Sequence, residues 1–351
     1  MTCRERDIHN MIRIGQVGAG AWGKNLLRHF SAADSSELIA CCDSDPAVLE
    51  RIRDTYPTAE ITTDFARLLR NDIDAVVVAT PPAAHYELCR AALEAGKDVF
   101  VEKPLVLHST DGEHLRKLSR KKKRILMVGH IMVYHPAVLW LREAIAKREL
   151  GEIYYLYATR VNLGKVRDIE NAMWSFAPHD ISIMRFLLNE DPVRVSATGM
   201  AYLQPGIEDV VFMTLHYSGR LMAQIHVSWL DPHKMRQLTV VGQKKMAVFT
   251  DTAANEKVTV FDKGVDAKLD YETYAEYLAL RTGDIMIPKI DIGEPLKEEV
   301  EHFLKCVRDR VQPRSDAVDG LRTLRVLEAG QESLKKGGAP VHVQPTVEDE
   351  V

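Results

Sequence analysis

The chain has 351 residues, of which 46% are hydrophobic and 27% charged, proportions typical of a folded globular protein with an ample core. Its 46 basic and 50 acidic residues give a formal charge of −4, which argues against a nucleic-acid-binding protein. The one dense basic run, residues 121–124, is interpreted as a solvated surface. Five cysteines form no CxxC pair, so we expect no bound metal.

The polar segment 1–10 lacks the apolar core of a signal peptide. The longest apolar runs of the chain are far too short to span a bilayer. We therefore predict a cytoplasmic protein.

In the first third, short apolar runs rich in β-branched residues alternate with segments of helical spacing. The runs lie at 12–17, 38–42, 75–79, 99–101 and 125–128, and the helical segments at 22–30, 47–55, 64–69 and 86–95. Strands with so few polar residues are buried on both faces, as in a parallel sheet covered by helices. The pattern predicts an α/β fold that begins with a doubly wound Rossmann domain over residues 1–128.

From residue 129 on, the sequence pattern changes to apolar and polar residues that alternate, as in strands with one buried face. After a helix at 136–148, strands are predicted at 153–162, 193–202, 210–217, 221–229, 237–241 and 246–249. Turn signals such as Ser218-Gly219 predict hairpins, and hence an antiparallel or mixed sheet. Two helices follow, at 296–308 and 317–336, the second capped by Ser315-Asp316. We predict a second, α+β domain over residues 129–351 that binds substrate and mediates oligomerisation.

The glycine-rich run 18–23 follows the first predicted strand and opens the first predicted helix, the context in which a Gly-x-Gly-x-x-Gly motif binds a dinucleotide. Gly18 permits the tight turn, Gly20 lets the backbone approach the pyrophosphate, and Gly23 allows helix and strand to pack closely. The predicted cofactor-binding residues of this run are Gly18, Gly20, Ala21, Trp22 and Gly23.

Asp43 comes twenty residues after Gly23, at the end of the second predicted strand. A carboxylate there accepts hydrogen bonds from the adenosine ribose hydroxyls and repels a 2′-phosphate. Ser44 follows, with no adjacent arginine that could hold such a phosphate. The sequence therefore predicts NAD rather than NADP, with Asp43 and Ser44 as cofactor-binding residues.

Two further segments come after strands that end at the same sheet edge. Thr80 and Pro81 follow the fourth predicted strand, and His85 then begins a helix, where a cofactor contact and a structural role are equally open. Glu102 and Lys103 follow the fifth strand, and a proline after them stiffens the turn that presents the lysine. We predict that all five residues contact the cofactor, and that Lys103 also reaches the substrate.

In the second domain, an apolar helix is expected to open near Pro178. This position puts His179 close to a helix N-terminus, which favours the neutral imidazole that a general base requires. A structural histidine is the alternative interpretation. Asp180 could be no more than a favourable charge at a helix start.

The motifs Gly-Ala-Gly-x-x-Gly, Ala-Thr-Pro-Pro-x-x-His, Glu-Lys-Pro and Ala-Pro-His-Asp-Ile-Ser, in this order, resemble the Gfo/Idh/MocA family of glucose-fructose oxidoreductase and inositol dehydrogenase relatives. The resemblance covers nearly the whole chain. It implies a Rossmann domain, a C-terminal domain with an open sheet, and a pyranose-type substrate bound between that sheet and the nicotinamide. It also implies that Lys103 and His179 are the catalytic pair.

The chain departs from the common family pattern at two positions near His179. Ser175 stands where an Asp is usual, and Ser182 where a second Asp is often found. The roles of Ser175 and Asp180 are therefore open. This variation resembles members that oxidise the 3-hydroxyl of a UDP-N-acetylhexosamine or its uronic acid.

The stretch 160–167 suits a nucleotide sugar, because its three cations and one amide could hold a diphosphate. A charged hairpin rim is the alternative. The predicted substrate-binding residues are Lys103, Tyr134, Arg160, Asn162, Arg167, Ser175, His179 and Asp180. Lys165 completes the charged stretch, and His135 is a further candidate beside Tyr134, whose ring could stack on a pyranose.

Together with this resemblance, the sequence predicts an NAD-dependent dehydrogenase that oxidises the 3-hydroxyl of a nucleotide-linked N-acetylhexosamine such as UDP-N-acetylglucosamine to a 3-keto sugar. In this reaction His179 accepts the hydroxyl proton and Lys103 stabilises the developing alkoxide. An NADPH-dependent keto-sugar reductase is one alternative, and a non-catalytic cofactor-binding regulator is another. We expect no nucleic-acid or membrane partner. The resemblance and an open sheet predict a homodimer or homotetramer formed through the second domain.

Overall fold

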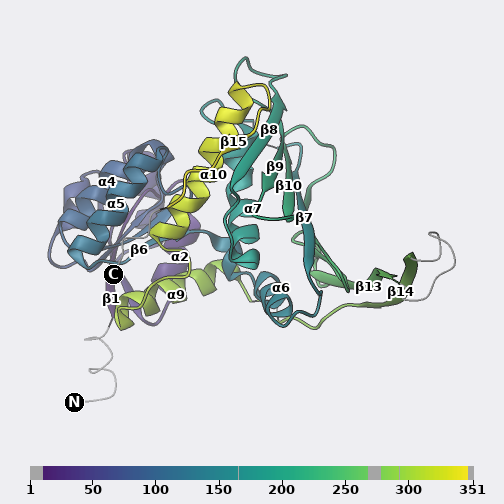
Figure 1. Ribbon diagram of the computed structural model, residues 1–351. Helices are drawn as coiled ribbons and strands as arrows, with labels where there is room; N and C mark the ends of the chain where they lie inside the picture. The colour runs from purple at the N-terminus through teal and green to yellow at the C-terminus, as the bar shows by residue number, and fades with distance from the viewer. Residues whose placement is uncertain (1–10, 165, 268–277, 292, 347–351) are drawn as a thin grey trace. The chain divides into compact units, whose positions relative to one another are not determined.

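The computed structural model describes residues 11–164, 166–267, 278–291 and 293–346 (Figure 1). The predictions made on segment 1–10 and on Lys165 lie outside these residues. The chain divides into two compact units, Met1–Tyr134 with Gly293–Leu324, and His135–Ile292 with Arg325–Val351. Each unit has its own sheet.

The first unit is built on a six-stranded sheet in the order β3-β2-β1-β4-β5-β6, and every neighbouring pair in it is parallel. This topology confirms the predicted Rossmann domain. Most central residues are fully buried, which explains the absence of polar alternation in the sequence. The strands are β1 (Ile12–Val17), β2 (Ser36–Cys42), β3 (Glu60–Thr62), β4 (Ala75–Val78), β5 (Asp98–Glu102) and β6 (Leu126–Gly129).

The helices of the first unit follow the predicted pattern in part. Helix α5 and the short 3₁₀ segments η3 and η4 were not predicted, nor was strand β3, and the predicted helix at 64–69 is a 3₁₀ segment, η2 (Phe65–Leu69). Helix α5 is too polar to show a clear apolar stripe, and it lies beside α4 (Figure 1). The helices are α2 (Gly23–Ala32), α3 (Pro46–Arg53), α4 (His85–Glu94), α5 (Ser109–Lys122) and α9 (Pro295–Asp309), with the short η3 (Pro82–Ala84) and η4 (Ile131–Tyr134).

Helix α9 belongs to the first unit although it comes late in the chain. Phe303 packs edge to face on Phe30 and Phe100, with ring centroids 5.9 and 5.7 Å apart. At the start of the helix, Glu294 accepts a hydrogen bond from Arg28 at 2.7 Å. The predicted boundaries assigned residues 129–351 to one domain, and the structure differs because the chain returns to bury aromatic surface on the Rossmann unit.

The second unit carries a nine-stranded sheet in the order β14-β13-β12-β11-β7-β10-β9-β8-β15. Its one parallel pair is β7 with β10, and the other neighbours are antiparallel. This confirms the predicted mostly antiparallel sheet, although β13, β14 and β15 were not predicted. The strands are β7 (Ile153–Val161), β8 (Arg194–Met200), β9 (Val210–His216), β10 (Met222–Ser228), β11 (Met235–Gly242), β12 (Met246–Thr250), β13 (Val258–Ala267), β14 (Leu278–Met286) and β15 (Val341–His342).

The sheet of the second unit is covered by helices on one face. Helix α7 (Ala172–Leu188) packs on β7, β9 and β10, and α6 (Pro136–Ala146) packs on α7 and β12. Strands β13 and β14 project beyond the rest of this sheet (Figure 1). Helix α10 (Ala317–Lys335) begins in the first unit and ends in the second, and Asp316 caps it by accepting a hydrogen bond from the Asp319 N–H at 2.9 Å, as predicted.

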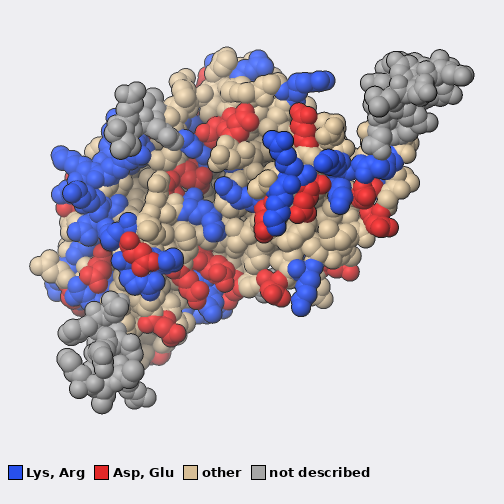
Figure 2. Space-filling view, turned by 60° about the horizontal axis from the view of Figure 1, so that its bottom comes forward, with Lys and Arg blue, Asp and Glu red and all other residues tan. Residues whose placement is uncertain are grey.

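In the described ranges, none of the helices has both the length and the apolar character needed to cross a bilayer. Figure 2 shows Lys and Arg side chains interspersed with Asp and Glu over the visible face. Mixed charge of this kind is typical of a solvated surface.

Candidate functional site

The glycine turn between β1 and α2 is shaped by two glycines that admit no side chain. Gly18 has φ +90°, and a Cβ there would lie 2.5 Å from the Ala79 carbonyl oxygen. A Cβ on Gly23 would clash with the Gly18 carbonyl oxygen. Gln16 braces the turn, because its Nε2 donates to the carbonyl oxygens of Gly18 and Gly23, both at 2.8 Å. Gln16 was not predicted, although its polarity inside an apolar strand was an available signal.

Gly20 differs from these two glycines, since a Cβ on it would meet no atom within 4 Å. The turn is therefore open on the side where a ligand would approach. Helix α2 begins without a side-chain cap and without an acidic residue in its first turn. A helix N-terminus of this kind suits an anionic group, so the turn fits the pyrophosphate of a dinucleotide. Ala21 and Trp22 are exposed on the same turn.

Asp43 lies at the end of β2, beside the glycine turn. Its Oδ2 accepts a hydrogen bond from the Ala19 N–H at 2.7 Å, and its Oδ1 accepts one from the Asp45 N–H at 3.0 Å. These bonds hold the half-buried carboxylate next to the turn, with the exposed Ser44 following it. The position fits the predicted contact with a ribose.

The loop after β4 brings a polar atom to the same edge. Thr80 Oγ1 is buried and has no hydrogen-bond partner among the described residues, so it remains available to a ligand. His85 is fully buried, and its Nε2 and Nδ1 lie 2.9 Å from the carbonyl oxygens of Thr80 and Pro104. Burial lowers the pKa of His85. The predicted cofactor contact of His85 is therefore not supported, because the ring lies between two loops and ties them together, while Pro81 is exposed.

The turn after β5 carries Glu102 and Lys103, and the Lys103–Pro104 peptide bond is cis. Glu102 Oε1 accepts a hydrogen bond from Trp22 Nε1 at 2.5 Å, which joins this turn to the glycine turn. Glu102 Oε2 accepts one from the Lys103 N–H at 3.2 Å. Burial raises the pKa of Glu102 to about 7, against the opposing effects of Trp22 and Lys103.

The predicted site residues of the first unit thus meet at one edge, where β1, β2, β4 and β5 end. Lys103 is half-buried there. Tyr134 also belongs to this unit, but it is 1% exposed, and its hydroxyl bonds Ser315 Oγ at 2.9 Å. The guanidinium of Arg314 lies 4.8 Å from its ring. The predicted sugar contact of Tyr134 is not supported, because both its ring and its hydroxyl are used in packing.

His179 lies in the second unit, and its surroundings correct one prediction. Helix α7 begins at Ala172, with Asn171 Oδ1 accepting a hydrogen bond from the Trp174 N–H at 3.1 Å. Pro178 is inside the helix rather than in its first turn. His179 is therefore in mid-helix, and the predicted effect of a helix N-terminus on its imidazole was wrong, because Asn171 is the stronger cap. The side chain of His179 is half-buried.

Asp180 and Arg160 form a buried ion pair between α7 and β7. Arg160 Nε and Nη2 donate to the two carboxylate oxygens of Asp180, at 2.8 and 2.9 Å. The two side chains are 7% and 3% exposed. Both are thus committed to each other, so Asp180 is more than a charge at a helix start. The pair fixes the helix that carries His179 onto the sheet.

The other predicted substrate residues of the second unit differ in exposure. Asn162 follows β7 and is half-buried, and Arg167 pairs with Glu170 at 2.9 Å. Ser175 is on α7 and is 3% exposed. His135 caps α6, since its Nδ1 accepts a hydrogen bond from the Ala137 N–H at 3.1 Å. Arg167 and Asn162 remain the accessible polar groups of the predicted diphosphate stretch.

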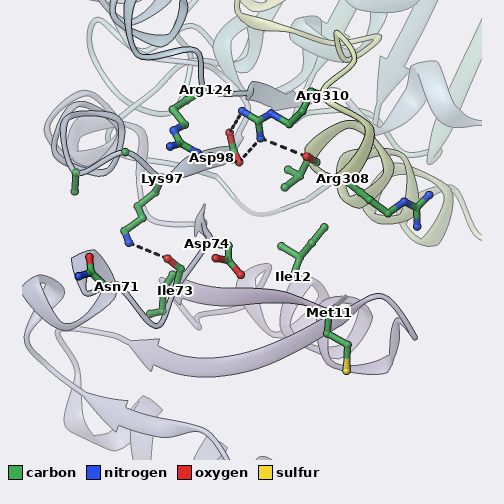
Figure 3. Close-up of a pocket in the computed structure, with 13 residues that line it drawn as sticks. Met11, Ile12, Asn71, Ile73, Asp74, Lys97, Asp98, Arg124, Arg308 and Arg310 are labelled. Atoms are coloured by element: carbon green, nitrogen blue, oxygen red, sulfur yellow. Dashed lines mark hydrogen bonds and ion pairs between the residues drawn. The ribbon is translucent and has the colours of Figure 1, made fainter. Parts of the chain in front are cut away.

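A pocket of about 630 Å³ lies at the opposite edge of the first sheet (Figure 3). It is lined where β1 and β5 begin, by Ile12, Lys97 and Asp98 among others. Asp98 accepts two hydrogen bonds from Arg310, at 2.7 and 3.1 Å. Lys97 Nζ donates to the carbonyl oxygens of Arg70 and Ile73. Because ligands of doubly wound sheets bind where the strands end, this pocket is not the dinucleotide site.

Family models match parts of both units of the chain. Residues 12–130 match the "Oxidoreductase family, NAD-binding Rossmann fold", and residues 138–248 match the "GFO/IDH/MocA C-terminal domain". Inositol 2-dehydrogenase of Rhizobium meliloti is 32% identical, over 92% of this chain and 97% of its own. UDP-N-acetylglucosamine 3-dehydrogenase of Acidithiobacillus ferrooxidans is 25% identical, over 89% and 94%.

A solved structure of the Acidithiobacillus ferrooxidans enzyme has the same fold, with a TM-score of 0.79 at 21% identity over 93% of this chain and 98% of its own. The fold and these matches define an NAD(P)-binding oxidoreductase with a Rossmann unit and a second unit built on a mostly antiparallel sheet. The chain belongs to the Gfo/Idh/MocA family.

Proposed function

We propose that this protein is an NAD-dependent dehydrogenase that oxidises a secondary hydroxyl of a ring polyol or sugar. The observation that carries the proposal is the single sheet edge at which the open Gly20, the carboxylate of Asp43 and Lys103 meet. A carboxylate at the Asp43 position favours NAD over NADP. NAD bound at this edge would supply the hydride acceptor.

In the proposed reaction, His179 accepts the proton of the substrate hydroxyl. Lys103 hydrogen-bonds the same oxygen and stabilises the negative charge that develops on it. Lys103 belongs to the first unit and His179 to the second. Arg160 and Asp180 act as positioning residues, because their ion pair holds α7 on β7.

Two substrates are favoured by specific observations. The relative at 32% identity is an inositol 2-dehydrogenase, which supports a cyclic polyol without a nucleotide. The relative at 25% identity is a UDP-N-acetylglucosamine 3-dehydrogenase, which supports oxidation of the 3-hydroxyl of a nucleotide-linked N-acetylhexosamine. The pairing of Arg160 with Asp180 removes one cation from the predicted diphosphate stretch and leaves Arg167 and Asn162 for that role.

The direct test is NADH formation by the purified protein with myo-inositol, UDP-N-acetylglucosamine and the parent sugars. We expect turnover with one of these ring compounds and tighter binding of NAD than of NADP. Tighter binding of NADPH, with reduction of a keto-sugar, would favour the reductase instead. Bound NAD without turnover on any of the compounds would favour the non-catalytic regulator.

A second measurement tests the assignment of the base. His179→Asn should lower kcat by ~10²- to 10⁴-fold and remove the ionisation that limits the rate at acidic pH. Loss of activity with an unchanged pH profile would contradict the role of His179 as the base. The double variant with Lys103→Ala should lose less than the sum of the single losses, since both groups act on one oxygen.

We also propose that a second copy of the chain covers the outward face of the second sheet. Tyr155 and Tyr157 stack there with centroids 6.2 Å apart, and the rings of Phe212 and His226 are 4.3 Å apart. Tyr155, Tyr157 and Phe212 are 42%, 39% and 44% exposed. Exposed aromatic surface of this extent is typical of an interface.

Light scattering should give the mass of a homodimer or homotetramer. A Tyr157→Glu variant should shift the measured mass towards that of a monomer. A native protein that is monomeric at micromolar concentration contradicts the proposal.

A further inference from the structure

Glu299 is an ionisable residue on the buried side of helix α9. The side chain is fully buried, in line with the apolar residues Leu296, Val300 and Phe303. Within the described residues, neither of its carboxyl oxygens has a hydrogen-bond partner. A buried carboxylate without a partner is strongly unfavourable, so the proton-bearing form of this group is favoured.

The ionisable groups around Glu299 come from two other elements. Glu102 and Glu299 lie on the faces of β5 and α9 that pack together. Phe100, two residues before Glu102 in β5, packs on Phe303, about one helical turn after Glu299, with ring centroids 5.7 Å apart. Burial first, and then the negative charge of Glu102, raise the pKa of Glu299 well above its ordinary value. Burial, and then the charge of Glu299, raise the pKa of Tyr134 on η4. The Tyr134 ring lies next to Arg314 and His302. On α2, Arg28 and His29 bind Glu294 at the start of α9 instead.

Glu102 connects two turns at the sheet edge where β1, β2, β4 and β5 end, which is the proposed cofactor edge. Its carboxylate accepts hydrogen bonds from Trp22 in the glycine turn and from the backbone of Lys103. Gly129 of β6 lies opposite Glu102 in the sheet, and a Cβ on it would come within 3.1 Å of Glu102 Oε1. The buried carboxylate thus lies between the glycine turn and the end of β6, with Lys103 as the neighbouring cation.

We propose that Glu102 and Glu299 form a coupled pair of buried carboxyl groups, in which Glu299 holds a proton and thereby keeps the ionised Glu102 bound to Trp22 and the Lys103 backbone. Two carboxylates in one enclosed site repel each other, and a proton on Glu299 removes this repulsion. Glu299 is a positioning residue that acts through Glu102. The pair rests on the proposed function only in that the glycine turn binds a dinucleotide.

The pair also has a defined effect on stability. Glu102 has a pKa of about 7 in the folded protein and 4.5 as its ordinary value, so the folded state binds more protons than the unfolded state between these pH values. The free energy of unfolding contributed by Glu102 therefore falls as pH rises from about 4.5 to about 7. Burial and the charge of Glu102 also raise the pKa of Glu299, so the contribution of Glu299 changes in the same direction as pH rises.

The first experiment needs neither cofactor nor substrate. Infrared spectra of the full chain at neutral pH should contain the carbonyl absorption of protonated carboxylic acids, and this absorption should be weaker in Glu299→Gln, which keeps only the part that Glu102 contributes. The matched control is Glu301→Gln, on the exposed side of the same helix, which should keep the native absorption. If the absorption of protonated carboxylic acids is the same in the native protein and in Glu299→Gln, then Glu299 is ionised and the proposal is overturned.

The second experiment tests the coupling. In Glu102→Gln, the acid band of Glu299 should disappear at lower pH than in the native protein, because the neighbouring negative charge is gone. An unshifted band means that the two groups are independent, which overturns the pair. This arm does not use Glu299→Gln, so it decides the matter even if that variant fails to fold.

The third experiment distinguishes a positioning role from a structural one. The emission of Trp22, obtained by difference from Trp22→Phe, should change across neutral pH as Glu102 ionises, and NAD affinity should fall roughly tenfold in Glu102→Gln. The NAD affinity of the native protein should decline at alkaline pH, as Glu299 loses its proton. Glu299→Gln, a neutral mimic of the protonated acid, should have the native NAD affinity at neutral pH and should not show this decline. An unchanged alkaline decline contradicts the positioning role. Because the infrared result is independent of turnover, a protein that oxidises no sugar would refute the proposed function and leave the pair intact.

Discussion

The two edges of the Rossmann sheet both carry charged residues, but they use them differently. At the edge where the strands begin, Asp98 binds Arg310 and Lys97 donates to two carbonyl oxygens. These charged groups of the pocket in Figure 3 therefore already have partners within the protein. At the edge where the strands end, Gly20 faces open space and Thr80 Oγ1 lacks a partner among the described residues. In this sheet, polar groups that the fold leaves available identify the candidate site better than a cavity does.

The largest expected effect comes from the lysine at the cofactor edge. Lys103→Ala should lower kcat by ~10²- to 10⁴-fold, because the developing negative charge loses its stabilising cation. NAD titration by fluorescence should show that the cofactor still binds. The matched control is Arg308→Ala, which removes a cation lining the opposite edge and should leave kcat near the native value. Near-normal turnover of Lys103→Ala would remove the lysine from the mechanism.

The next effect concerns stability in the second unit. Asp180→Ala should lower the free energy of unfolding by about 3–5 kcal/mol, because it leaves the buried guanidinium of Arg160 without its partner. Denaturant titration measures this loss. The double variant Arg160→Met with Asp180→Leu should recover much of it, since it removes both charges. A small loss in Asp180→Ala would show that Arg160 has other partners, such as a substrate phosphate.

At the edge where the strands begin, Asp98→Asn should lower the free energy of unfolding by about 1–3 kcal/mol. The carboxylate is 3% exposed but Arg310 is 43% exposed, so solvent screens part of their interaction. NAD affinity should stay unchanged, because these charges serve the fold rather than a ligand. A large loss of NAD affinity would contradict the assignment of the dinucleotide to the other edge.

The smallest expected change in stability separates the glycines of the turn. Gly20→Ala should alter the free energy of unfolding by less than about 1 kcal/mol, since the added methyl group meets no protein atom. It should nevertheless weaken NAD binding by roughly tenfold, by occupying the space that the pyrophosphate needs. Gly23→Ala, which would clash with Gly18, should instead destabilise the protein. Equal NAD affinity of Gly20→Ala and the native protein would contradict the predicted approach of the cofactor.

Much of the cofactor edge was predictable because its signals are local. The glycines of run 18–23, Asp43 and Lys103 each follow an apolar strand, and parallel strands bring such residues to one edge. Gln16 and Glu299 were not predicted. Their roles depend on what surrounds them after folding, and a single polar residue in an apolar stretch does not reveal its partners.

His179 shows that a local signal can also predict the wrong helix start. The Pro178-His179 pair indicated a helix start, but Asn171 caps the helix earlier, and the proline is accommodated inside it. The role of Asp180 likewise became visible when Arg160, twenty residues earlier, was found against it. Local propensity ranks possible helix starts, and long-range contacts decide among them.

The class of fold, the family and the residues at the ends of the Rossmann strands could be predicted from the sequence alone. These follow from apolar runs, turn chemistry and motif spacing, all of which act over short distances along the chain. Only the folded structure reveals that residues 293–324 return to the first unit, that Arg160 is paired with Asp180, and that Glu299 is buried where α9 packs on β5. These features join residues far apart in the chain, so they arise from packing and burial that no local pattern encodes.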